Sequence, residues 1–118
     1  MTSALHFVVV DSRDPVSLAR FWCAALGYEV HEEYEEGIRI APPDGGRPLL
    51  DFLFVPEPKV TKNRMHLDLR PTDTDQAGEV VRLESLGARR VNVGQGPEVD
   101  WVVLSDPEGN EFCVLAGL

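Results

Sequence analysis

The sequence has few cysteines, few aromatic residues and few basic residues. Two cysteines in 118 residues give no disulfide framework, so reduced thiols are expected. The 11 Lys and Arg residues against 20 Asp and Glu residues leave a net charge of −9. This balance argues against a nucleic-acid partner, because phosphate binding needs clustered basic side chains. It is compatible with small cationic ligands.

Long apolar runs are also missing. No run reaches the ~18 residues that a membrane span needs, and the start Met1–Ala4 lacks a basic region followed by an apolar core. We therefore expect a cytoplasmic protein with no membrane partner. A content of 43% hydrophobic residues is typical of a globular protein. At 118 residues, the chain is long enough for one such domain and too short for two independent ones.

The sequence does contain a duplicated pattern of a strand followed by a helix. The segment 63–70 alternates like a strand with His66 on its polar face, and the segment 4–10 places His6 in the same register, 60 residues earlier. The helical patterns that follow end at Leu26-Gly27 and Leu86-Gly87, again 60 residues apart. Two related units would bring the two histidines towards each other.

Both halves follow one order of elements: a strand, a helix and three strands. The first helix is predicted to begin at Asp14-Pro15 and the second at a capping box on Asp73. The expected strands are 4–10, 28–33, 37–41 and 48–55, then 63–70, 88–93, 99–105 and 111–115. Residues 56–63 carry two prolines and are the expected linker. One domain, 1–118, would thus hold module one (1–58) and module two (64–118).

Strand parity divides the side chains between two faces. The face expected against the helices carries Leu5, Phe7, Val9, Phe52, Phe54, Met65, Leu67, Leu69, Phe112 and Val114. The face expected towards an enclosed space carries His6, Val8, Asp51, Leu53, His66, Asp68, Glu111 and Cys113. Polar groups collect on the second face, as a ligand cup requires and a plain core avoids.

With these motifs in order, the chain resembles the vicinal oxygen chelate superfamily, and more narrowly its glyoxalase-like and bleomycin-resistance-like domains. The resemblance rests on the His6 strand, Asp14-Pro15, Ala19-Arg20-Phe21-Trp22, Ala25-Leu26-Gly27-Tyr28, Arg64-Met65-His66-Leu67-Asp68-Leu69 and Asp106-Pro107-Glu108-Gly109-Asn110-Glu111-Phe112. It implies an α+β fold in which two tandem βαβββ modules pair into a half-open, cup-shaped mixed sheet with the helices outside. Its metal enzymes hold a divalent ion with ligands from the first and last strand of each module.

The family positions transfer to this chain with one substitution and one ambiguity. The first strands supply His6 and His66, whereas the last strand of module two has Cys113 where the family has a glutamate. In module one, two residues could occupy the position that corresponds to Cys113. Asp51 follows the turn residue Asp44 at the same distance as Cys113 follows the turn residue Asp106, whereas the offset of 60 residues between the modules makes Leu53 the counterpart of Cys113. The implied metal set is His6, Asp51, His66 and Cys113, for zinc, iron, nickel or manganese.

Three further side chains are expected to contact the ligand: Leu53, Asp68 and Trp101. Asp68 is expected to pair with Arg70, with the alternative that it orients His66. Trp101 is expected either in the core or at the rim of the cup, stacked on a ligand.

Two functions from different classes follow from the resemblance. The first is a metal-dependent lyase, isomerase or dioxygenase acting on a small oxygenated substrate. The second is a metal-free protein that binds or sequesters a ligand such as an antibiotic in the same cup. The histidine pair favours the first, whereas a thiol at Cys113 is a poor substitute for a carboxylate base and favours the second. The cup would close in a monomer or in a homodimer.

Overall fold

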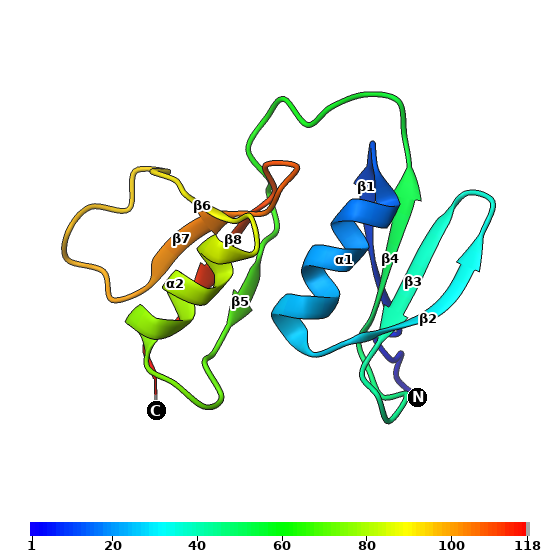
Figure 1. Cartoon of the computed structure of the whole chain (residues 1–118), viewed down its shortest axis with the longest axis horizontal. Coiled ribbons are helices and arrows are strands. Elements are labelled where there is room, and N and C mark those ends of the chain that lie inside the picture. The colour runs from blue at the N-terminus through cyan, green and yellow to red at the C-terminus, as the bar shows by residue number, and fades with distance from the viewer. Residues whose placement is uncertain (118) are drawn as a thin grey trace. The chain divides into compact units, whose positions relative to one another are not determined.

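The computed structural model describes residues 1–117, which fall into two compact units, Met1–Pro58 (unit 1) and Lys59–Leu118 (unit 2) (Figure 1). Each unit has a strand, a helix and three strands in that order. The predicted α+β class with two βαβββ modules is therefore confirmed. Residue 118, the predicted end of module two, lies outside the described residues.

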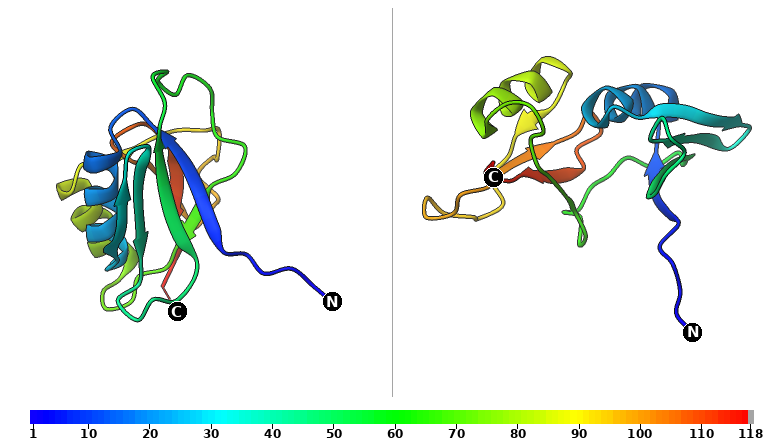
Figure 2. Two further views of the ribbon diagram at one scale, coloured as in Figure 1. Left: turned by 90° about the vertical axis from the view of Figure 1, so that its right-hand side faces the viewer. Right: turned by 90° about the horizontal axis from the view of Figure 1, so that it is seen from below.

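Unit 1 is a four-stranded mixed sheet with one helix. Its elements are β1 (Phe7–Ser12), α1 (Pro15–Leu26), β2 (Glu29–Tyr34), β3 (Gly37–Ala41) and β4 (Leu49–Phe54). The strand order is β1-β4-β3-β2, with β1 parallel to β4 and the other neighbours antiparallel. The helix α1 lies along one face of this sheet and packs on β3 and β4 (Figure 2). The other face of the sheet, which carries Asp51, is not covered by α1.

The ends of α1 follow the local sequence. The Asp14 carboxylate accepts a hydrogen bond from the backbone N–H of Ser17 at 3.2 Å, and Pro15 occupies the first turn, as predicted. Gly27 ends the helix with φ 69°, a left-handed conformation that glycine adopts without strain. Between these ends, the helix buries Leu18, Ala19, Phe21, Trp22 and Ala25.

Unit 2 repeats the topology with shorter strands. Its elements are β5 (Leu67–Leu69), α2 (Gln76–Ser85), β6 (Arg89–Arg90), β7 (Val102–Ser105) and β8 (Glu111–Val114), in the sheet order β5-β8-β7-β6. The helix α2 covers one face and contacts β8 (Figure 2). Among the described residues, neither helix combines the length and the apolar character that a membrane crossing requires.

Side-chain hydrogen bonds explain why β6 is shorter than the predicted strand 88–93. The N–H of Gly94 donates to Asn92 Oδ1 at 2.7 Å, and the N–H of Val93 donates to Gln95 Oε1 at 2.8 Å. These local bonds satisfy backbone groups that a longer strand would have paired. Residues 91–101 therefore form a loop.

The start of α2 lies two residues later than predicted. Asp75, not Asp73, is the N-cap, and its carboxylate accepts from the N–H of Gly78 at 2.8 Å. Gln76 does not complete a capping box, because it is the first residue after the N-cap rather than the third; its amide donates instead to the carbonyl oxygens of Asp100 and Val114. The first turn of α2 is thus fastened to the sheet.

The predicted parity of β1 is wrong by one residue. In the parallel pairing with β4, Val9 lies beside Asp51, and Val10 lies beside the fully buried Phe52. Since paired neighbours share a face, Phe7 and Val9 lie on the face of Asp51 rather than against α1. The prediction failed because the four apolar residues 7–10 have no alternation of their own.

Candidate functional site

A cavity of about 480 Å³ lies in unit 2. Its floor is the sheet face that carries Asp68, Cys113 and Val103, which are consecutive partners across β5, β8 and β7. Their neighbours on the opposite face, Phe112 and Val114, are buried. The remaining lining comes from segments around the sheet: Lys62, His66, Val93, Gly94, Gln95, Trp101, Glu111 and Leu115.

Three side chains with metal-ligand atoms meet at this floor. Nε2 of His66 lies 3.2 Å from Oδ1 of Asp68, and each of His66, Asp68 and Cys113 has a ligand atom within 4.8 Å of the others. Burial, together with the charge of Asp68 and a hydrogen bond to it, raises the pKa of Cys113. The thiol is therefore protonated at neutral pH, and the Asp68 carboxylate interacts with both the imidazole of His66 and the thiol of Cys113.

The expected ion pair between Asp68 and Arg70 is wrong. Arg70 Nη1 donates to the backbone carbonyl of Ala116 at 3.0 Å, so this guanidinium fixes the segment after β8. The carboxylate of Asp68 lies against His66 instead. This contact agrees with the alternative expectation, in which Asp68 orients the imidazole of His66.

In unit 1, Asp51 is held by an arginine that the sequence analysis overlooked. Arg39 donates from Nε to Oδ1 of Asp51 at 2.8 Å and from Nη2 to Oδ2 at 3.1 Å, a bidentate pair. The Asp51 side chain is 8% exposed, and Arg39 also contacts Glu32 at 3.1 Å. Both oxygens of the predicted ligand are therefore already bound to a cation of the chain.

Aromatic rings fix the guanidinium in place. Cζ of Arg39 lies 4.3 Å from the centre of the Phe7 ring and 5.7 Å from that of Tyr34. Burial and a hydrogen bond to Asp51 raise the pKa of Tyr34, which stays neutral. Stacking on a ring and a two-point bond to a carboxylate are the geometry that suits arginine best.

The parallel strand pairs identify the counterpart of His66 in unit 1. In unit 2, the partner of Cys113 is Asp68, and His66 stands two residues before it. In unit 1, the partner of Asp51 is Val9. With Asp51 matched to Cys113, the residue two positions before Val9 therefore corresponds to His66, and it is a phenylalanine.

Matching Leu53 instead of Asp51 to Cys113 does not make His6 the counterpart of His66 either. Leu53 pairs with Asp11, so matching Leu53 to Cys113 makes Val9 the counterpart of His66. His6 precedes β1 and is exposed, with its ring 4.4 Å from that of Phe7. The offset of 60 thus does not describe the strand register. His6 and Asp51 belong to unit 1 and His66 and Cys113 to unit 2, and their sharing of one metal stays a prediction.

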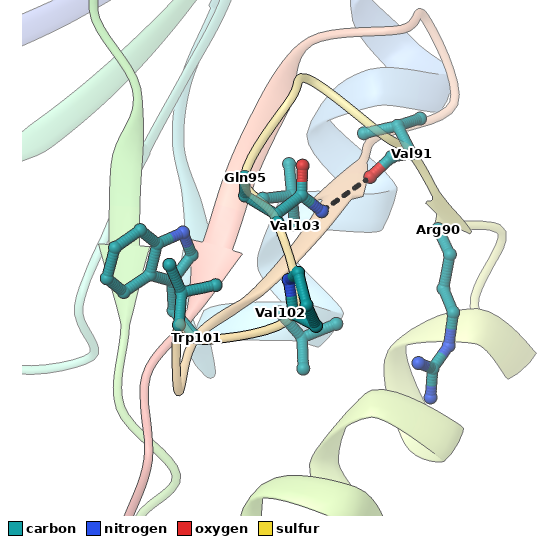
Figure 3. Close-up of a pocket in the computed structure, with 9 residues that line it drawn as sticks. Arg90, Val91, Gln95, Trp101, Val102 and Val103 are labelled. Atoms are coloured by element: carbon teal, nitrogen blue, oxygen red, sulfur yellow. Dashed lines mark hydrogen bonds between the residues drawn. The ribbon is translucent and has the colours of Figure 1, made fainter.

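Trp101 precedes β7 and is 40% exposed. It lines the cavity described above and also a second cavity of about 250 Å³ beside the loop 91–101. Figure 3 shows the second cavity, where the Gln95 amide points to the carbonyl of Val91, to which it donates at 3.3 Å. Gln95, Trp101 and Val103 line both spaces. Of the two expected locations, Trp101 occupies the rim.

Arg39 had a signal in the sequence. The antiparallel strands β3 and β4 pair symmetrically about Gly45, since Ile40 faces Leu50 and Arg39 faces Asp51. Counting six residues from Gly45 in each direction (45 − 6 = 39 and 45 + 6 = 51) gives the pair. A basic residue between two isoleucines, opposite an acid on the next strand, predicts a cross-strand ion pair.

Glu111 anchors the segment before β5 to the start of β8. Its Oε2 lies 2.8 Å from Lys59 Nζ, and its Oε1 accepts the backbone N–H of Asn63 at 2.8 Å. Burial acts to raise the pKa of this carboxyl, but the two hydrogen bonds and the Lys59 charge together lower it below its usual value. The cavity therefore has a fixed wall on this side.

This anchor predicts an acid-dependent loss of stability. A lowered pKa in the folded state means that the contribution is complete above the usual carboxyl pKa of 4.5 and is lost as pH falls through the lower folded value. We expect Glu111→Gln to cost about 1.5–3 kcal/mol at neutral pH and to reduce the loss of stability on acidification. Urea unfolding from neutral to acid pH measures both, with the exposed Glu98→Gln as control. A variant with the pH dependence of the wild type would contradict the role of Glu111.

Comparison with known proteins agrees with this architecture. The sequence pattern of a family described as "Glyoxalase-like domain" matches residues 7–115. Among curated proteins, none matches the chain significantly. The sequence match begins at β1 and ends just after β8, so it spans both units.

Solved structures share the fold at low sequence identity. A glyoxalase/bleomycin resistance protein/dioxygenase family enzyme from Burkholderia phytofirmans PsJN has a TM-score of 0.74 and 19% identity, over 95% of this chain and 97% of that one. The antibiotic binding protein TnmS3 from Streptomyces sp. CB03234 has a TM-score of 0.66 and 20% identity, over 98% and 96%. The fosfomycin resistance protein FosX from Mesorhizobium loti has a TM-score of 0.70 and 14% identity, over 100% and 94%. At these identities, the likeness concerns the fold alone.

Proposed function

The chain belongs to the family of glyoxalase-like domains, and from this premise we propose that it binds a small molecule without the divalent metal used by the metal enzymes of the superfamily. The observation that carries the proposal is the bidentate pair of Arg39 and Asp51. A carboxylate whose two oxygens each accept a hydrogen bond from a guanidinium already has its charge balanced, so a metal would have to compete with that cation for the same oxygens. The cavity of unit 2 would hold the ligand.

The donor set does not fit the metal centre of the superfamily. At the four strand positions, this chain has Phe7, Asp51, His66 and Cys113. Phe7 has no ligand atom, and the charge of Asp51 is neutralised by Arg39. Cys113 offers a soft sulfur donor in place of an oxygen. Of these four side chains, only the imidazole of His66 is of the type that the superfamily's metal centre uses and is not already paired with a cation. A protein that binds and retains its ligand, as the antibiotic-binding relative is named to do, needs none of these donors.

A second function has support from unit 2 alone. His66, Asp68 and Cys113 have ligand atoms close enough to share one ion, and an imidazole, a carboxylate and a sulfur donor are a set that zinc accepts. Such a site would make the protein a zinc-dependent enzyme of the same family. Unlike the metal centre of the superfamily, it would take no ligand from unit 1.

Metal content tests the proposal directly. We expect untagged protein, incubated with zinc, iron, nickel and manganese and then desalted, to retain far less than one equivalent of any of them. Elemental analysis by mass spectrometry is the measurement, with Co²⁺ absorption as an independent readout of thiolate or imidazole ligation. Stoichiometric metal that is lost in His66→Ala and kept in the control His31→Ala would overturn the proposal and support the metal site on which the second function depends. His31 is an exposed histidine of β2 in unit 1.

A further inference from the structure

We infer that the cavity of unit 2 selects a planar, largely apolar ligand that carries a cationic or hydrogen-bond-donating group. This inference rests on the proposed binding function and gives it a ligand class. It is carried by two features of the cavity: an indole ring without a ring contact or hydrogen bond among residues 1–117, and a half-exposed carboxylate on the cavity floor.

Trp101 supplies the flat surface. The side chain is 40% exposed, and among residues 1–117 it takes part in no ring contact and its indole N–H in no hydrogen bond. The other tryptophan, Trp22, is 3% exposed and packs edge-on against Phe21. A large ring left exposed at the rim of a cavity has apolar area and a π face to offer to a ligand. Planar rings use such a surface most fully, because they stack on it.

Asp68 and His66 supply the polar end. The carboxylate of Asp68 is 48% exposed, and His66 is 44% exposed. Nε2 of His66 faces Asp68, and no hydrogen bond occupies its other ring nitrogen within residues 1–117. A carboxylate and an imidazole nitrogen are acceptors for an N–H or O–H group of a ligand. A cation would gain further from the carboxylate and from the face of Trp101.

The remaining charges at the cavity do not reverse this preference. Both oxygens of Glu111 are engaged by Lys59 and by the N–H of Asn63. The ammonium group of Lys62 donates to the carbonyl of Asn63 at 3.2 Å, on an exposed side chain. The net charge of −9 for the whole chain also disfavours an anionic ligand. Val103 and Leu115 complete an apolar wall.

Three probes separate the parts of this inference. 9-Aminoacridine is a planar cation with N–H donors, 2-naphthoate is a planar anion, and cyclohexylammonium is a cation without a flat ring. Calorimetric titration of the full chain in the presence of EDTA is expected to show binding of 9-aminoacridine at least tenfold tighter than that of the other two. Equal binding of 2-naphthoate, or no binding of 9-aminoacridine either in EDTA or after zinc is added, would overturn the ligand class.

Variants assign the contacts. We expect Trp101→Ala to weaken 9-aminoacridine binding about tenfold, since it removes the aromatic face on which the ligand stacks, and Trp101→Phe to weaken it much less. Asp68→Asn should weaken the cation severalfold and leave 2-naphthoate unchanged or improved. Circular dichroism and melting temperature check that each variant is folded. Unchanged affinity in folded Trp101→Ala would refute the stacking surface.

Failure of the ligand class can be distinguished from failure of the proposed function. If 9-aminoacridine bound only after zinc was added and EDTA removed, the metal-free function would be wrong while the ligand class held. If it did not bind with or without metal, and the metal content stayed far below one equivalent, the ligand class would be wrong while the metal-free character held.

Discussion

Replacing Arg39 by methionine is expected to lower the free energy of unfolding by about 3 kcal/mol. Asp51 would then be a charged group with 8% of its side chain exposed and no cation beside it. Removing one partner of a buried ion pair typically costs about 3–5 kcal/mol, and the lower value applies because Arg39 is 26% exposed. The loss would be measured by urea denaturation of Arg39→Met against the wild type.

Two controls make the result specific to the pair. Arg47→Met removes an exposed arginine of the same unit and should change stability by less than about 0.5 kcal/mol. The double variant Arg39→Met with Asp51→Leu should regain most of the loss, because apolar replacement of both partners leaves no unpaired charge. Equal losses in the single and double variants would show that the packing of the arginine on Phe7, not its charge, is what matters.

The second large effect is expected in the core of unit 1, where Phe52→Ala should cost about 3–5 kcal/mol. The Phe52 side chain is 0% exposed in β4, between Val10 and Ile38 on the neighbouring strands. Truncation removes a ring from a close-packed layer and leaves a cavity that the sheet and α1 cannot fill by collapse. Chemical denaturation measures the change.

Phe54 is a matched control on the same strand. It has the same parity as Phe52, and the sequence pattern predicted both against the helix. In the structure, Phe54 is 56% exposed at the end of β4, so Phe54→Ala should cost less than about 1 kcal/mol. A loss similar to that of Phe52→Ala would mean that Phe54 is covered in solution by a surface that unit 1 does not itself provide.

Local chemistry made the helices and turns predictable from sequence. The cap at Asp14, the proline at position 15 and the glycine at position 27 each act within a few residues, so the sequence alone determines the ends of α1. The start of α2 was less certain because two aspartates, Asp73 and Asp75, offer the same cap, and the choice depends on Gln76 reaching the carbonyls of Asp100 and Val114. That contact is tertiary.

Strand register was predictable only where polar residues alternate with apolar ones. His66 and Asp68 alternate with leucines, and their common face was predicted correctly, as their contact shows. The uniformly apolar β1 gave no such signal, and its parity was assigned from His6 instead. A strand has a period of two, so an error of one residue moved every side chain of β1 to the wrong face.

Several residues that line the cavity of unit 2 were singled out from sequence, whereas the partners of the singled-out residues were not. Asp51, Asp68, Trp101 and Cys113 were singled out from sequence, but the pattern could not show that Asp51 is already bound. That fact depends on a cross-strand pair, whereas the pattern of residues 37–55 by itself predicts only two strands joined by a turn. Residues that satisfy one another across a sheet have to be sought as pairs, by counting outward from the turn.

The guanidinium of Arg39 has a consequence for the conditions under which the protein works. A positive charge supplied by a side chain is made with every copy of the chain, needs no loading after synthesis and cannot be exchanged for a competing ion. It also has no second oxidation state. If the protein binds its ligand without a metal, as proposed, chelators and metal starvation have no target at the Arg39–Asp51 pair.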